Sequence, residues 1–282
     1  MSDVQEGEAT IVESASESTA VSAEFATADG VIYYELVQAA DADGEERPTI
    51  TLLHNFMSTG HTAWGPLLNK LAQRYRLLLP DLPGHGRSLG HPSGYHYGEM
   101  AEQLAALMTH VGAQNGHLIG CSAGGMIAQL LVQSGSITPQ TLTLVSTTYS
   151  IAENVTGEGH ALKPENFRAG RRWMEATAAL HDPYRYPGYY ESVMLAGFRQ
   201  LNPNRAINLP LTALAQWSMP VCIIHGTEDE FFPVTIAQQM AETIPNAVLQ
   251  LVPSQPHALL FRQPWRVLRL FEEFLAKNET SG

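Results

Sequence analysis

Three residues far apart in the chain have the side chains needed for nucleophilic catalysis: Ser122, Asp229 and His257. A serine hydroxyl is a weak nucleophile by itself, so it needs a base that takes its proton and a carboxylate that orients the base. Ser122 is the middle residue of the stretch 120–124, Gly-Cys-Ser-Ala-Gly, which matches the pattern G-x-S-x-G. That pattern indicates a nucleophile where a strand precedes it and a helix follows it.

The residues around Ser122 predict that arrangement. Residues 117–120 form a short apolar run typical of a strand, and residues 124–132 have the pattern of a helix. The small residues allow a sharp turn that presents the hydroxyl, and the start of the helix directs free N–H groups toward a developing oxyanion. Cys121 is the alternative nucleophile, but its position beside the centre of the turn predicts a packing role.

Asp229 and His257 each follow an apolar run, at residues 221–224 and 248–252. If both runs are parallel strands, the two side chains lie at the same edge of the sheet as Ser122. An aspartate would orient the histidine and stabilise its cation. Glu228 and Glu230 are the alternative carboxylates beside Asp229.

The remaining elements alternate in a way that predicts a mostly parallel sheet with helices on both faces. Two antiparallel strands around the Asp29-Gly30 turn come first. Further strands are expected at 49–54, 77–79 and 142–145, and helices at 64–75, 98–111, 234–243 and 265–275. We expect a core formed by residues 23–148 and 219–278. Residues 149–218 contain no strong strand and predict a helical cap inserted after the sixth strand.

Composition excludes several classes of function. The net charge of −12 disfavours a nucleic-acid partner, and it offers no basic anchor for an anionic membrane. The two cysteines, Cys121 and Cys222, provide no disulfide framework, which favours a reducing, cytoplasmic location. Residues 1–22 are acidic and poor in apolar side chains, so a disordered tail is expected. No H-E-x-x-H or tight Cys/His cluster indicates a metal site.

From about residue 23 onward the chain resembles the α/β-hydrolase superfamily. The resemblance is carried by the elbow at Ser122, by the stretch 81–88 (DLPGHGRS), and by Gly226, Asp229 and Pro233 in a G-x-x-D-x-x-x-P loop. It implies an α/β-hydrolase fold with the chain order Ser, Asp, His for the triad. It also implies that 81–88 is a structural turn, with no catalytic role for its aspartate or histidine.

The resemblance further implies an oxyanion hole formed by the backbone N–H groups of Phe56 and Ala123. The stretch 54–57 is His-Asn-Phe-Met, where the family usually has a glycine in second position. Asn55 tolerates left-handed backbone geometry and adds a side-chain donor. If the loop is shifted by one residue, Met57 takes the place of Phe56. The stretch HNFMSTGHTAW is weakly similar to the enol-lactone hydrolase branch.

These observations predict a serine hydrolase that cleaves a small, partly apolar carboxylic ester or lactone through an acyl-enzyme, without a cofactor. Carbon–carbon bond hydrolysis, perhydrolysis and ligand binding on a hydrolase fold use the same residues and remain alternatives. Asn55, Trp173, Tyr184 and Tyr186 are candidate substrate-binding residues, although the aromatic ones could equally form the core of the cap. The partner is expected to be a small molecule, and the pattern indicates no particular oligomeric state.

Overall fold

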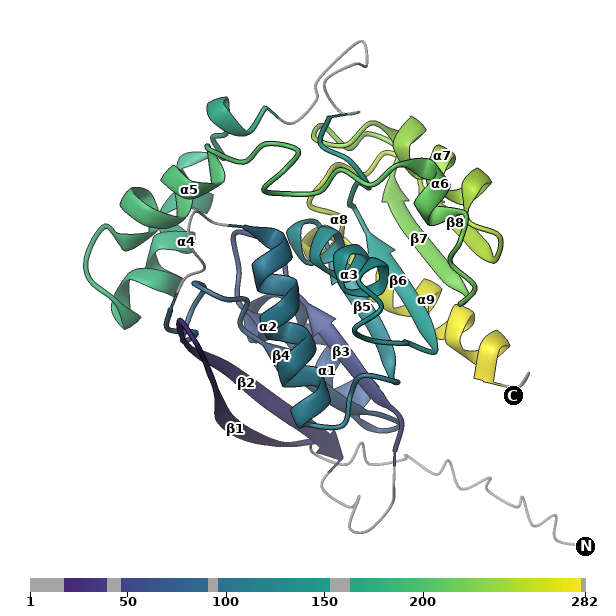
Figure 1. The fold of residues 1–282 in the computed structure, drawn as a ribbon, viewed down its shortest axis with the longest axis horizontal. Coiled ribbons are helices and arrows are strands. Elements are labelled where there is room, and N and C mark those ends of the chain that lie inside the picture. Colours follow the sequence, from purple (N-terminus) through teal and green to yellow (C-terminus); the bar gives the residue numbers. More distant parts are fainter. Residues whose placement is uncertain (1–17, 40–46, 91–95, 153–162, 280–282) are drawn as a thin grey trace, which may run out of the picture.

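A sheet of eight strands forms the centre of the computed structural model, which describes residues 18–39, 47–90, 96–152 and 163–279 (Figure 1). The strand order is β1-β2-β4-β3-β5-β6-β7-β8. The strands are β1 Ser18–Thr27, β2 Gly30–Ala39, β3 Thr49–Leu53, β4 Arg76–Pro80, β5 His117–Cys121, β6 Thr141–Val145, β7 Val221–Gly226 and β8 Ala247–Val252.

The sheet is mostly parallel, as predicted. β1 pairs with β2, and β2 with β4, in antiparallel fashion, whereas the pairs from β4 across to β8 are parallel. Gly120 of β5 lies opposite Leu53 of β3, and Cys121 lies opposite Val145 of β6. The carboxyl ends of these three central strands therefore meet at one edge, where the chain continues into the loops that could carry chemistry.

Helices cover both faces of the sheet. They are α1 Gly60–Ala72, α2 Tyr97–His110, α3 Ala123–Gln133, α7 Val234–Thr243, α8 Leu259–Arg262 and α9 Pro264–Glu279. On one face, α1 and α9 bury Trp64, Leu71 and Phe271 against the sheet. On the other, α2, α3 and α7 bury residues such as Leu104 and Met240. Apolar residues at helical spacing thus form the contact between each helix layer and the strands.

The segment between β6 and β7 is helical, and we call it the cap (green in Figure 1). It contains η2 Pro164–Asn166, α4 Arg171–His181, η3 Asp182–Tyr184, the π-helical turn η4 Tyr190–Leu195, α5 Ala196–Phe198 and α6 Leu211–Leu214. The residues that follow β6 are bonded to those that precede α6, because Ile151 N–H donates to Ile207 O at 3.0 Å and Leu209 N–H donates to Tyr149 O at 3.0 Å. The cap therefore begins and ends at one place on the core.

The first strand begins at an earlier residue than the sequence predicted. Of the expected disordered tail, residues 1–17 lie outside the described residues, but residues 18–22 are the first part of β1 and pair with residues 35–39 of β2. Here the partner strand, rather than burial of apolar side chains, supplies the ordering interaction, because the backbone groups of β1 form a ladder with β2. None of the described helices combines the length and apolarity that crossing a membrane requires.

The packing of α9 generates a stability prediction. Phe271 is 2% exposed within the core under α9, so Phe271→Ala should lower the free energy of unfolding by about 3–5 kcal/mol. Trp265 lies on the same helix but is 61% exposed, so Trp265→Ala should change it by no more than about 0.5 kcal/mol. Urea denaturation of both variants tests this, and equal losses would contradict the assignment of the buried face.

Candidate active site

Ser122 occupies a strained turn between β5 and α3. Its backbone has φ 52° and ψ −115°, a conformation that non-glycine residues seldom adopt. Hydrogen bonds hold it: Ser122 N–H donates to Val145 O at 2.9 Å, and Ser122 O accepts from Met126 N–H at 3.0 Å and from the Thr147 hydroxyl at 2.8 Å. The elbow predicted from G-x-S-x-G is therefore present, with the serine at its apex.

Two glycines of α3 explain why the turn can be so sharp. A Cβ atom at Gly124 would lie 2.5 Å from the backbone oxygens of Leu53 and His54. A Cβ atom at Gly125 would lie 2.7 Å from the Cβ atom of Thr147. The start of α3 is thus pressed between the ends of β3 and β6, and larger side chains would push it away.

The structure brings Ser122, His257 and Asp229 together as a chain of hydrogen bonds. Ser122 Oγ lies 3.0 Å from His257 Nε2. On the other side of the ring, His257 Nδ1 lies 2.9 Å from Asp229 Oδ2 and 3.1 Å from Oδ1. With Nδ1 protonated toward the carboxylate, Nε2 is free to accept the serine proton.

The carboxyl group of Asp229 is fully buried but remains suited to carry a charge. Burial raises its pKa, but the opposing effects of the His257 and His225 rings and of hydrogen bonds prevail, so the pKa lies below the usual range. Asp229 Oδ1 accepts from the backbone N–H groups of Phe231 and Phe232, both at 2.9 Å. The carboxylate is therefore stabilised in its ionised form, which the orienting role requires.

The loops that carry Asp229 and His257 are bonded to each other. Glu228 N–H donates to Gln255 O at 3.0 Å, and His257 N–H donates to Glu230 Oε2 at 2.8 Å. Glu230 thus contacts the backbone of the histidine rather than its ring. Of the three acidic residues at 228–230, Asp229 is the one whose carboxylate contacts the imidazole nitrogen, so Asp229 fits the orienting role best.

His225, the penultimate residue of β7, is a neighbour of the candidate triad that sequence reasoning missed. It is fully buried, its Nε2 lies 2.9 Å from Phe232 O and 3.6 Å from Asp229 Oδ2, and burial lowers its pKa. It therefore donates from Nε2 to the loop that carries Asp229. Its position directly before the G-x-x-D pattern is the feature of the sequence that could have indicated a place near Asp229.

The loop that precedes the predicted oxyanion hole is fixed by His54. His54 Nδ1 donates to Asn55 O at 2.7 Å, while Nε2 accepts from Leu82 N–H at 2.8 Å. Among the described residues, the non-glycine residues with positive φ are Ser122, Ser146 and Ser254, so Asn55 does not use the left-handed geometry that an asparagine tolerates. The imidazole, rather than a left-handed residue, sets the path of this loop.

Cys121 lies beside the nucleophile position but differs from it in environment. It is 3% exposed, and burial together with the charge of Asp229 raises the pKa of its thiol to about 12. A thiol in this state carries almost no thiolate, which is the reactive form. Cys222 is also buried, and neither cysteine is in a disulfide.

An outer pocket of about 420 Å³ opens at Ser122 and His257. Asn55 and Trp173, both expected to bind substrate, line it. Residues that sequence reasoning missed also line it: Met57, Phe167, Arg168, Glu230, Phe231 and Phe261. The available signal was proximity in the chain to residues already singled out, since Met57 follows Phe56, Glu230 and Phe231 follow Asp229, and Phe261 comes soon after His257.

A smaller inner pocket of about 50 Å³ also meets Ser122, and its lining overlaps that of the outer pocket. Phe56 and Ala123, whose backbone N–H groups are the predicted oxyanion donors, line it. Ala123 is the first residue of α3, so its N–H belongs to the unpaired first turn of the helix. Asn55, Ser122 and His257 contribute the polar part of its lining, and the rest is apolar: Met57, Met126, Phe167, Phe198, Phe231 and Phe232.

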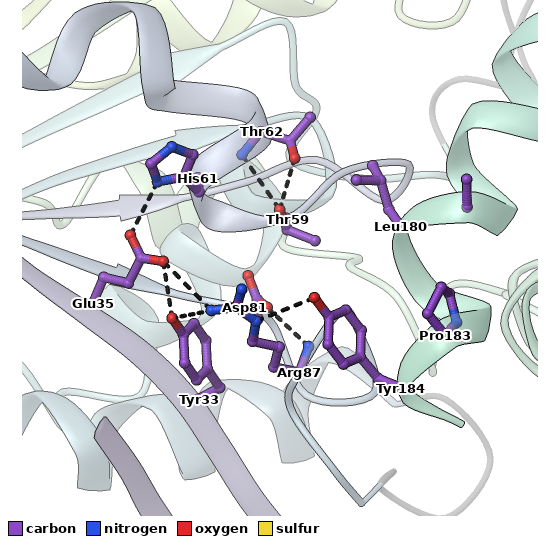
Figure 2. Close-up of a pocket in the computed structure, with 11 residues that line it drawn as sticks. Tyr33, Glu35, Thr59, His61, Thr62, Asp81, Arg87, Leu180, Pro183 and Tyr184 are labelled. Carbon is purple, nitrogen blue, oxygen red and sulfur yellow. Dashed lines mark hydrogen bonds and ion pairs between the residues drawn. The ribbon is translucent and has the colours of Figure 1, made fainter. Parts of the chain in front are cut away.

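Tyr184 and Tyr186, expected to bind substrate, do not line either pocket at Ser122. Figure 2 shows Tyr184 in a separate pocket between the cap and the loop after β4, where its hydroxyl accepts from Arg87 Nε at 3.3 Å. Tyr186 is 51% exposed and packs edge-on against Tyr189. Both belong to η3 and the turn after it, which contacts the stretch 81–88 rather than the triad.

The charged and polar residues that line the pocket in Figure 2 are paired with one another. Arg87 contacts the hydroxyl of Tyr33, and Glu35 accepts from the same hydroxyl at 2.9 Å and lies 3.0 Å from His61 Nδ1. The carboxylate of Asp81 accepts from Gly60 N–H at 2.9 Å. Such mutual pairing is typical of a structural network. Within the described chain, no group of three or more His, Cys, Asp or Glu side chains is arranged to hold a metal.

The parallel sheet, the elbow at Ser122 and the loops at its carboxyl edge define an α/β-hydrolase fold. A model of the alpha/beta hydrolase family matches residues 52–269, and the chain belongs to this family. It is 26% identical over 246 residues to the magnesium-chelatase 30 kDa subunit of Rhodobacter capsulatus, covering 79% of this chain and 84% of that protein.

Two solved structures share the fold at low identity. One is 2-hydroxy-6-oxo-6-phenylhexa-2,4-dienoate hydrolase from Rhodococcus sp. strain RHA1, with a TM-score of 0.71 and 18% identity over 92% of this chain and 100% of that one. The other is Est816, described as an N-acyl homoserine lactone degrading enzyme, with a TM-score of 0.70 and 22% identity over 89% and 100%. Identities in this range establish the common fold alone.

The close approach at Gly124 generates a prediction for the elbow. Gly124→Ala should lower the free energy of unfolding by about 1–3 kcal/mol, because the new methyl group overlaps the backbone at the end of β3. Gly170→Ala is the matched control, since its Cβ atom would meet nothing within 4 Å, and should change stability by less than about 1 kcal/mol. Urea denaturation measures both, and a tolerated Gly124→Ala would contradict the packing described.

Proposed function

We propose that this protein is a serine hydrolase that cleaves a small, partly apolar carboxylic ester or lactone through an acyl-enzyme. The observation that carries the proposal is the chain of hydrogen bonds from Ser122 Oγ through His257 to Asp229, with distances of 3.0 and 2.9 Å. The apolar lining of both pockets supports a partly apolar substrate. Membership of the alpha/beta hydrolase family supports a hydrolytic reaction.

In the first half of the reaction, Ser122 Oγ attacks the carbonyl carbon while His257 Nε2 takes the hydroxyl proton. The negative charge that develops on the carbonyl oxygen is stabilised by the N–H groups of Phe56 and Ala123. Loss of one such donor typically raises the barrier by roughly 3–4 kcal/mol. His257 then delivers its proton to the leaving alcohol, and Asp229 stabilises the imidazolium between these steps.

In the second half, His257 takes a proton from water, and the resulting hydroxide attacks the acyl carbon. The bond between Ser122 Oγ and that carbon breaks, and the proton returns to the serine. No group is oxidised or reduced, so the reaction is complete with water as the second substrate.

The first experiment tests the nucleophile. Ser122→Ala should abolish hydrolysis of 4-nitrophenyl acetate, lowering kcat by roughly 10⁶-fold or to the background rate. Cys121→Ala is the matched control and should retain hydrolysis, because the buried thiol is not the attacking group. Release of 4-nitrophenol is measured by absorbance. The reverse result, with Cys121→Ala inactive and Ser122→Ala active, would reassign the nucleophile.

A second experiment uses pH. His257 must be neutral to accept the serine proton, whereas Asp229, with its lowered pKa, stays ionised on the acid side. A plot of log(kcat/KM) against pH should therefore fall toward low pH with a slope of one, since a single proton uptake stops the reaction. Asp229→Asn should lower kcat by roughly 10⁴-fold. A slope of two would mean that a second group is protonated over the same pH range, which would contradict the lowered pKa of Asp229.

The substrate class needs a panel of compounds. Esters, an N-acyl homoserine lactone and a 2-hydroxy-6-oxo-dienoate cover the reactions named for the two similar structures. Hydrogen peroxide added to the ester assay tests perhydrolysis, since peroxide can replace water at the acyl-enzyme. Turnover of the dienoate without turnover of esters would favour carbon–carbon bond hydrolysis. Tight ligand retention that depends on Ser122, without turnover, would favour a binding function.

A further inference from the structure

Two spaces of unequal size meet at the candidate nucleophile. The inner pocket measures about 50 Å³ and the outer pocket about 420 Å³. Both are lined by Ser122 and His257, so the reacting carbonyl lies at their junction. One half of an ester bound there must point into each space.

The five residues that line the inner pocket but not the outer one are all buried. Phe56, Met126, Phe198 and Phe232 are each at most 5% exposed. Phe198 of the cap stacks on Phe56 with 4.2 Å between ring centroids, which seals the side toward the cap. A cavity of roughly 150 Å³ holds a benzene molecule, so one of about 50 Å³ holds only a few non-hydrogen atoms.

The outer pocket, by contrast, is exposed to solvent. Trp173 is 46% exposed and packs edge-on against Phe261, with 5.7 Å between the ring centroids. Arg168 and Glu230, both exposed, add charged groups to an otherwise mainly apolar lining. This space suits a larger group with an aromatic or cyclic body and a polar end.

The order of the two reaction steps assigns one half of the substrate to each pocket. The acyl group stays bonded to Ser122 Oγ after the first step, whereas the alcohol leaves and water enters. The departing alcohol and the entering water need the open space of the outer pocket. The inner pocket can therefore hold only the acyl group that stays on Ser122.

Resting on the proposed function, we propose that the inner pocket holds the acyl half and restricts it to a short chain, while the outer pocket holds a bulkier alcohol half. The substrate class is then a short-chain carboxylic ester, acetyl to about butanoyl in size, of an aromatic or cyclic alcohol. Ring opening of a lactone leaves both halves on the serine, so the closed pocket favours open-chain esters over lactones.

Two isomeric esters test the assignment with equal overall size. Benzyl acetate has a small acyl half and a large alcohol half, and methyl phenylacetate has the reverse. We expect kcat/KM for benzyl acetate to exceed that for methyl phenylacetate by at least about tenfold, because excess atoms in a tight apolar pocket discriminate on this scale. Release of the acid is followed by pH-stat titration.

Variants of each pocket identify which wall sets the preference. Phe198→Ala should narrow the ratio between the two esters by about tenfold by admitting the phenyl group to the inner pocket. Met126→Ala enlarges the same pocket from α3 and serves as a second variant if Phe198→Ala does not fold. Trp173→Ala is the matched control in the outer pocket, and it should lower kcat/KM for benzyl acetate without raising it for methyl phenylacetate.

The outcomes separate this inference from the proposed function. Ser122-dependent hydrolysis with a preference for methyl phenylacetate would overturn the inference alone. So would a ratio that responds to Trp173→Ala but to neither Phe198→Ala nor Met126→Ala. Failure of both esters while 4-nitrophenyl acetate or a lactone is hydrolysed would overturn the inference alone, and absence of Ser122-dependent hydrolysis of any of these compounds would overturn the proposed function as well.

Discussion

The close approach of backbones at the start of α3 is the constraint on which the candidate site depends. Without side chains at Gly124 and Gly125, the helix rests directly against the ends of β3 and β6. This contact fixes the positive φ of Ser122, because the chain must reverse between β5 and α3 within one residue. It also brings the N–H of Ala123 and the loop after β3 to the same side of the serine. The candidate nucleophile and the predicted oxyanion donors are therefore positioned by one packing contact.

The other half of the site depends on a buried carboxylate. Removing a charge from water is unfavourable, so Asp229 is tolerated only because two backbone N–H groups and the His257 ring compensate it. The same bonds fix the loop between β7 and α7 and orient the imidazole toward Ser122. Stability of the ionised carboxylate and geometry of the base thus have the same physical origin.

The sequence predicted those parts of the structure that follow from local pattern. The strands ending at Ser122 and before Asp229 and His257 were evident from short apolar runs, and parallel pairing then brings their ends together. The linings of the pockets were harder to predict, since they depend on how the short helices of the cap pack. Trp173 on α4 lines the outer pocket, whereas Tyr184, in η3 after the end of α4, contacts Arg87 because η3 turns the chain away. The pairing of residues 18–22 was missed because a polar strand is ordered by its neighbour.

Buried histidines connect the cap to the loop that carries the predicted oxyanion donor. His181, the last residue of α4, accepts from Gly86 N–H at 2.7 Å, and its ring packs edge-on against His85, which packs in the same way against His54. Burial lowers the pKa of His54 to about 3, so its ring is neutral and offers one acceptor and one donor. Only a neutral imidazole can accept from Leu82 N–H while donating to Asn55 O. These histidines could suggest a metal site by their number. Instead, His54 and His181 form hydrogen bonds with backbone groups that burial would otherwise leave unpaired.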